Sequence, residues 1–129
     1  MPEKYIRRDS QLNWLQEFKE KPVIKVITGV RRCGKSTLFK LFAEDLLANG
    51  VKPEQIISIN LEELENESLL DYRSLYEYLK ARLYPGGYTY IFLDEVQRCE
   101  GYEKAVDSLY IKDNVDIYIT GSNAYMLSG

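Results

Sequence analysis

The chain contains no histidine among its 129 residues, and this absence removes several classes of site. Ser-His-Asp nucleophilic chemistry, histidine-ligated zinc and a histidine general base are all excluded. Any proton transfer must therefore use a carboxylate, a lysine or a water molecule. Cysteine is also scarce, because Cys33 and Cys99 are too few for a disulfide framework.

Long apolar runs and targeting segments are missing as well. No run approaches the roughly 20 apolar residues that a helix needs to cross a bilayer, so no membrane partner is expected. Nothing at the N-terminus resembles a signal peptide, and we expect a cytoplasmic protein. The net charge of −3 does not indicate nucleic acid as a partner.

The residues that are present are typical of a soluble globular domain. Hydrophobic residues make up 45% of the chain and charged residues 29%, which is enough apolar material for a packed core. A chain of this length has room for one such core. We therefore expect residues 1–129 to form a single domain.

The segment Gly29–Ser36 matches the phosphate-binding loop pattern G-x-x-x-x-G-K-[ST] at every fixed position. The pattern is informative when a strand precedes it and a helix follows it. The apolar, β-branched run Val23–Thr28 predicts the strand. Apolar residues at helical spacing predict the helix up to Asn49-Gly50, namely Leu38, Leu41, Phe42 and Leu46.

This loop predicts a nucleotide phosphate site. Its glycines let several backbone N–H groups converge on phosphate oxygens, and the dipole of the following helix adds positive potential. Lys35 would meet the β- and γ-phosphates, Ser36 would bind Mg²⁺, and Thr37 continues the row of amides. Cys33 is either a redox-sensitive thiol or a tolerated small side chain. The predicted nucleotide-binding residues are Gly29, Val30, Arg31, Arg32, Cys33, Gly34, Lys35, Ser36 and Thr37.

The rest of the chain alternates between helices and strands. Before the loop, Asp9 or Ser10 is expected to cap a helix that ends at Lys19–Pro22. After the loop, we expect an acidic surface loop over Glu62–Glu67 and an amphipathic helix from Tyr72 to Leu83. The other predicted elements are strands over Gln55–Leu61, Tyr88–Leu93 and Val115–Ile119 and a helix over Tyr102–Tyr110.

This alternation indicates an α/β fold with a parallel sheet covered by helices on both faces. In such sheets, ligands bind at the carboxyl ends of the strands. The predicted strands all end in polar or turn residues, namely Thr28-Gly29, Asn60, Asp94-Glu95 and Thr120 to Asn123. One edge of the sheet is therefore expected to carry the chemistry.

The most informative strand end is Asp94-Glu95, which follows an apolar run. Two adjacent acids at a buried strand end are costly unless a cation meets them, and Mg²⁺ supplies that charge. Asp94 is predicted to hold the ion, which leaves Glu95 to polarise an attacking water. Asn60, Ser122 and Asn123 either touch the γ-phosphate and the water or only form turns.

Together these residues resemble the AAA+ superfamily of P-loop ATPases. The segments GVRRCGKSTLF, IFLDEVQ and YITGSN are similar to a group of bacterial and archaeal proteins called predicted AAA+ ATPases. The resemblance implies a three-layer P-loop NTPase fold, with the predicted strands in the order 1-4-3-2. It also implies ATP and Mg²⁺ as ligands, with Ser36 and Asp94 at the metal and Glu95 activating water.

The resemblance also implies roles for the other strand ends. Asn123 or Ser122 falls at the position of sensor one, and Asn60 falls where many AAA+ proteins keep a polar residue that restrains the catalytic glutamate. Tyr5-Ile6-Arg7 lies where the family often contacts adenine. Family members continue with a fifth strand, an arginine finger and a helical lid, so we expect residues 1–129 to be a truncated core. A homo-oligomer or a C-terminal domain would then supply the arginine, and the isolated chain would hydrolyse ATP slowly or not at all.

Three functions are compatible with these features. The first is a Mg²⁺-dependent ATPase, and the second is a nucleotide-binding switch with little turnover. The third is a small-molecule kinase, which would need an acceptor pocket and an arginine-rich lid that we do not find after Asp94-Glu95. A GTPase is disfavoured, because no N-K-x-D motif follows a strand.

Overall fold

The computed structural model describes the backbone of residues 5–9, 12–28 and 32–121, and the side chains of residues 15–27 and 38–121. Within these ranges the chain forms a parallel sheet in the order β1-β2-β5-β4-β3. The strands are β1 (Tyr5–Asp9), β2 (Ile24–Thr28), β3 (Ile56–Asn60), β4 (Thr89–Asp94) and β5 (Val115–Thr120).

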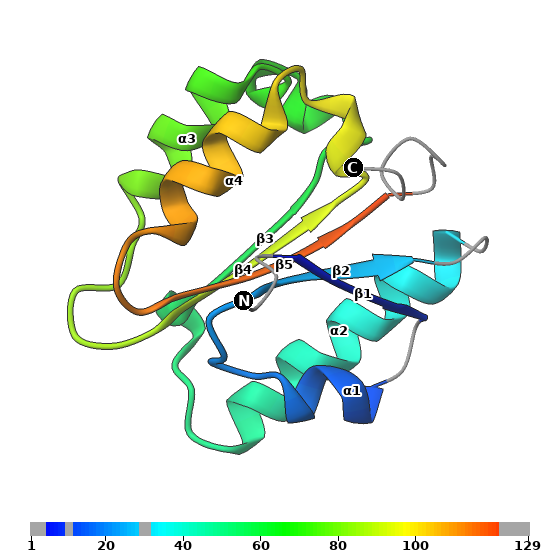
Figure 1. The fold of residues 1–129 in the computed structure, drawn as a ribbon, viewed down its shortest axis with the longest axis vertical. Helices are drawn as coiled ribbons and strands as arrows, with labels where there is room; N and C mark the ends of the chain where they lie inside the picture. The colour runs from blue at the N-terminus through cyan, green and yellow to red at the C-terminus, as the bar shows by residue number, and fades with distance from the viewer. Residues whose placement is uncertain (1–4, 10–11, 29–31, 122–129) are drawn as a thin grey trace.

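Helices cover both faces of this sheet (Figure 1). One face carries α1 (Leu12–Glu17) and α2 (Arg32–Ala48), and the other carries α3 (Tyr72–Lys80) and α4 (Tyr102–Tyr110), as Figure 1 shows. Short 3₁₀ helices complete the described elements, namely η1 (Pro53–Gln55), η2 (Leu64–Leu69) and η3 (Val96–Arg98). The predicted three-layer α/β fold is therefore confirmed.

The strand order agrees with the sequence, and one strand was not predicted. The predicted strands are β2, β3, β4 and β5, and their order β2-β5-β4-β3 is the expected 1-4-3-2. The additional strand, β1, pairs with β2 from Tyr5 opposite Ile24 to Asp9 opposite Thr28. Asp9 therefore ends a strand and does not cap the first helix, whereas Ser10, the other predicted cap, lies outside the described residues. Pairing with a distant strand outweighs the local capping preference here.

Two element boundaries also differ from the predictions. The acidic segment predicted as a loop contains η2, because Leu69 turns into the core and is only 8% exposed. The helix predicted to reach Leu83 ends at Lys80. Its start is defined by Asp71, whose carboxylate accepts the backbone N–H of Ser74 at 3.0 Å.

Alternate side chains of the strands fill two cores, one on each face. Toward α3 and α4 the sheet presents aliphatic residues, namely Ile24, Val26, Ile57, Ile59, Ile91, Leu93, Ile117 and Ile119. Toward α1 and α2 it presents mainly aromatic residues, namely Tyr90, Phe92 and Tyr118, together with Ile27. Burial of both faces fixes the strands, and so fixes the residues at their ends.

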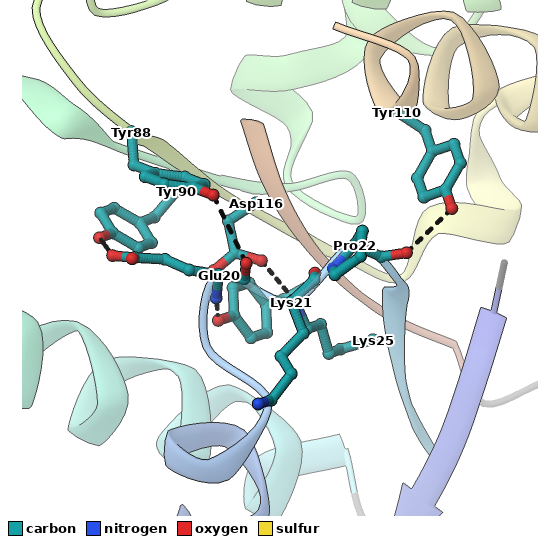
Figure 2. A network of polar contacts seen from close by, with 9 residues as sticks. Glu20, Lys21, Pro22, Lys25, Tyr88, Tyr90, Tyr110 and Asp116 are labelled. Carbon is teal, nitrogen blue, oxygen red and sulfur yellow. Dashed lines mark hydrogen bonds and ion pairs between the residues drawn. The ribbon is translucent and has the colours of Figure 1, made fainter. Parts of the chain in front are cut away.

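The amino-terminal edge of the sheet carries a buried polar network (Figure 2). Lys25 on β2 and Asp116 on β5 are enclosed, with 2.5 Å between Nζ and Oδ1. Asp116 also accepts the backbone N–H of Glu20 at 2.8 Å and the hydroxyl of Tyr118 at 2.7 Å. Tyr90 on β4 donates to the Glu20 carboxylate. The network ties the connection between α1 and β2 to the centre of the sheet.

Burial opposes both charges of the Lys25–Asp116 pair. It lowers the pKa of Lys25 and raises the pKa of Asp116, whereas their mutual attraction counteracts both shifts. Removing one partner of such a pair costs about 3–5 kcal/mol, because the other charge is left buried alone. The pair therefore holds this edge of the sheet in place.

Candidate functional site

The carboxyl ends of neighbouring strands bring several predicted site residues to one edge of the sheet. Asp94 ends β4, and Asn60 lies opposite it at the end of β3. Thr120 ends β5, which lies between β4 and β2. Glu95 follows Asp94 directly. This is the edge at which parallel α/β sheets bind their ligands.

The predicted phosphate loop leads into the same edge. β2 ends at Thr28 and α2 begins at Arg32, so a strand and a helix flank the loop as the motif requires. Gly29, Val30 and Arg31 lie outside the described residues. Arg32, Cys33, Gly34, Lys35, Ser36 and Thr37 form the start of α2, and only their backbone is described.

The hydroxyl of Thr120 links the two acidic residues of the site. It donates to Asp94 Oδ1 and accepts the backbone N–H of Glu95 at 3.0 Å. All three residues are buried, with 0% exposure for Thr120, 7% for Asp94 and 3% for Glu95. Buried polar groups of this kind need partners, and Thr120 supplies one to each acid. The sequence analysis placed Thr120 among the polar strand ends at this edge, but it did not predict that Thr120 bridges the two acids.

Glu95 has a backbone conformation that is unusual for a residue with a side chain. Its φ of 56° and ψ of 50° lie in the left-handed region, which costs about 1–2 kcal/mol. The hydrogen bond to Thr120 and the backbone bond from Arg98 N–H to the Glu95 carbonyl, at 3.1 Å, hold this conformation. Strained residues that a fold maintains in this way cluster at functional sites.

Gln97 is a residue that the sequence predictions missed. Its Nε2 donates to Glu95 Oε1 at 2.8 Å, and it lies in η3, the turn that follows β4. Gln97 closes the segment IFLDEVQ that carries the family resemblance, but the sequence analysis assigned no role to it. The local turn brings the two side chains together.

Asn60 is engaged by its own turn. Its Oδ1 accepts the backbone N–H of Glu62 at 2.9 Å, and its backbone carbonyl accepts Asn66 Nδ2 at 2.8 Å. Its predicted role as a restraint on Glu95 stays a prediction. Ser122 and Asn123 lie outside the described residues, so their predicted sensor role stays a prediction as well.

Described residues line cavities at opposite edges of the sheet. One of about 340 Å³ runs between α2 and β3 and reaches Asn60 and Asp94. A larger one, of about 510 Å³, lies at the amino-terminal edge beside Tyr88 and Tyr110. We assign the site to the edge with the smaller cavity, because ligands of parallel sheets bind at the carboxyl ends of the strands.

The described acids fit a particular kind of metal site. No group of three or more carboxylates and thiols among the described residues could enclose a metal. A buried carboxylate such as Asp94 suits Mg²⁺, which commonly takes one or two carboxylates and completes its shell with phosphates and water. A membrane span requires a long apolar helix, and none of the described helices is long and apolar enough to cross a membrane.

Comparison with known proteins agrees with this geometry. The model of a family described as an AAA domain matches residues 21–129. An uncharacterized protein of Haemophilus influenzae is 37% identical over 131 residues, which cover 100% of this chain and 32% of that protein. The chain thus spans about a third of the length of the curated relative it matches. No solved structure matches significantly. The residues that match the family model include the phosphate loop, Asp94-Glu95 and β5. The chain therefore belongs to the AAA-domain family of AAA+ P-loop ATPases.

Proposed function

We propose that the chain binds ATP through Gly29–Thr37 and hydrolyses it by in-line attack of water, with Mg²⁺ bound to the phosphates. The observation that carries the proposal is the meeting of two features at one sheet edge. The connection from β2 to α2 and the buried Asp94-Glu95 pair at the end of β4 are separated only by β5. A phosphate site beside two carboxylates is the arrangement that phosphoryl transfer to water requires.

Each residue then has a defined task. Lys35 binds the β- and γ-phosphates, and the backbone amides at the start of α2 meet the phosphate oxygens. Ser36 and Asp94 would hold Mg²⁺, which would supply positive charge to offset the negative charge that develops on the phosphates. Glu95 orients and polarises the attacking water. Thr120 maintains the arrangement of the two acids through its two hydrogen bonds.

Nucleotide binding is tested by thermal shift with ATP, ADP and GTP, each with and without Mg²⁺. We expect ATP with Mg²⁺ to raise the unfolding temperature of the wild type and not that of Lys35→Ala. Lys80→Ala removes an exposed lysine from α3, on the other face of the sheet, and is the control, with stabilisation retained. A Lys35→Ala variant that ATP stabilises as well as the wild type would refute the site.

Hydrolysis is tested with Glu95→Gln in the full-length protein. The amide keeps the shape of the side chain and cannot take a proton, so ATP binding should persist while turnover is lost. Glu100→Gln, at an exposed position beyond the same turn, should retain turnover. Undiminished turnover by Glu95→Gln would exclude Glu95 as the activating group. A wild type that binds ATP without turning it over would instead favour the nucleotide switch.

A further inference from the structure

Gln97 contacts the carboxylate of Glu95 in the turn that follows β4. The backbone bonds described above fix where the Glu95 side chain starts, but they do not fix the torsions that aim its carboxylate. Gln97 Nε2 binds Oε1 of that carboxylate at 2.8 Å, a normal length for a charge-assisted hydrogen bond.

Gln97 is itself held on a well-anchored turn. Val96, its neighbour in η3, is fully buried, and Cys99 is 1% exposed. The backbone N–H of Cys99 donates to the Val96 carbonyl at 3.0 Å, and Glu100 N–H donates to the Leu70 carbonyl at 2.7 Å. The amide of Gln97 therefore extends from a turn that is packed on both sides.

The chemistry of the two groups fixes which way the amide faces. An ionised carboxylate only accepts hydrogen bonds, so the NH₂ end of Gln97 must face Glu95. The Oε1 of Gln97 is buried, and no described residue donates to it. A buried acceptor of this kind lowers stability unless a donor meets it, and its retention beside an activating carboxylate points to a functional use.

We propose that Gln97 is a positioning residue for Glu95, holding the carboxylate in the orientation from which it polarises the attacking water. This inference rests on the proposed ATPase function. It also differs from the role implied by the family resemblance, in which Asn60 controls the glutamate, since the Asn60 side-chain oxygen is bound to the turn at Glu62.

The decisive variant is Gln97→Met in the full-length protein, because methionine keeps the length of the side chain and removes both the donor and the acceptor. We expect kcat to fall about tenfold to a hundredfold, the range that a misdirected catalytic group costs. KM for ATP and the stabilisation by ATP should stay as in the wild type. Gln97→Glu should lose at least as much rate, since it places a like charge beside Glu95. Gln16→Met, at an exposed position on α1, is the matched control with unchanged kcat.

A merely structural role would give a different pattern, in which KM and the unfolding temperature change together with kcat. The link through Glu95 is checked in the Glu95→Gln background, where Gln97→Met should not lower the residual rate further. Two results would overturn this inference and leave the proposed ATPase function standing. One is that Gln97→Met lowers kcat equally in the wild-type and Glu95→Gln backgrounds. The other is that the wild type hydrolyses ATP and Gln97→Met has the same kcat. A wild type without turnover would overturn it together with the proposed function.

Discussion

At the scale of single residues, the site is organised by side chains that do no chemistry themselves. Asp94 and Glu95 are recognisable in the sequence because two acids end an apolar strand. What keeps them in place is the Thr120 hydroxyl, which bonds one acid through its proton and the other through its oxygen. Such a bridge satisfies two buried groups at once, and its loss leaves both without that partner.

Replacing Thr120 by valine tests the bridge, because valine keeps the branched shape and lacks the hydroxyl. We expect a loss of about 1–3 kcal/mol of unfolding free energy, since the Glu95 N–H and Asp94 Oδ1 each lose a hydrogen bond in a buried place. Thr120→Ser retains the hydroxyl and should stay close to the wild type. Urea denaturation measures both variants. Equal stability of the serine and valine variants would show that the hydroxyl contributes little.

The limits of sequence reasoning are also clearest at this scale. The phosphate loop, Asp94 and Glu95 follow local sequence patterns, so they can be recognised as candidate site residues from the sequence alone. Thr120 and Gln97 take part only because of where the chain brings them: Thr120 through pairing of β5 beside β4, and Gln97 through a tight turn. Neither threonine nor glutamine is distinctive by type, and only the geometry identifies them.

At the scale of elements, local patterns predicted four strands of the sheet, including β3 at one edge, and missed β1 at the other edge. β2, β4 and β5 lie inside the sheet, so their apolar runs are long enough to be recognised as strands from the sequence. β1 lies at the edge and includes the charged residues Arg7, Arg8 and Asp9, which do not resemble a core strand. Its pairing with β2 depends on contacts with a segment distant in sequence, which no local pattern records.

Helix α4 depends on a glycine immediately before it. Gly101 has a φ of 70°, and a Cβ there would lie 2.8 Å from Cδ2 of Tyr72 on α3. Gly101→Ala should therefore combine backbone strain with displacement of a packed ring. Gly50→Ala is the matched control, since Gly50 also has a positive φ, of 98°, but no atom lies within 4 Å of the added Cβ.

We expect Gly50→Ala to lower the free energy of unfolding by about 1 kcal/mol, because alanine is strained in the left-handed conformation. Gly101→Ala should lower the free energy of unfolding clearly more, and the difference between the two variants measures the cost of displacing the Tyr72 ring. Chemical denaturation of the two variants against the wild type gives both values. If the two substitutions cost the same, the Tyr72 ring moves aside freely and the contact between these helices is loose.

At the scale of the whole molecule, the two edges of the sheet have separate tasks. The carboxyl edge holds the candidate site, and the amino-terminal edge holds the Lys25–Asp116 network. Burial also makes acidic protons difficult to remove, both in this network and in the core toward α3 and α4. Burial raises the pKa of the Tyr118 and Tyr90 hydroxyls and raises the pKa of the Cys99 thiol to about 12.

These shifts link stability to alkaline pH. In the unfolded chain the thiol of Cys99 ionises near its ordinary pKa of 9.0, whereas in the folded protein it keeps its proton up to about pH 12. Between these values the folded state binds more protons than the unfolded state, so the free energy of unfolding falls as the pH rises. The contribution of the thiol is complete below pH 9.0 and is lost progressively up to about pH 12.

The contribution of Cys99 can be isolated by comparing slopes of stability against pH. Cys99→Ala removes the titrating group, so between pH 9 and pH 11 its unfolding free energy should fall less steeply than that of the wild type. Val106→Ala also removes volume from a fully buried position of the same core and carries no titrating group. Val106→Ala should lower the free energy of unfolding at every pH without changing its slope against pH. Urea denaturation at a series of pH values measures all three proteins, and equal slopes for Cys99→Ala and the wild type would mean that the thiol ionises as readily in the folded core as in the unfolded chain.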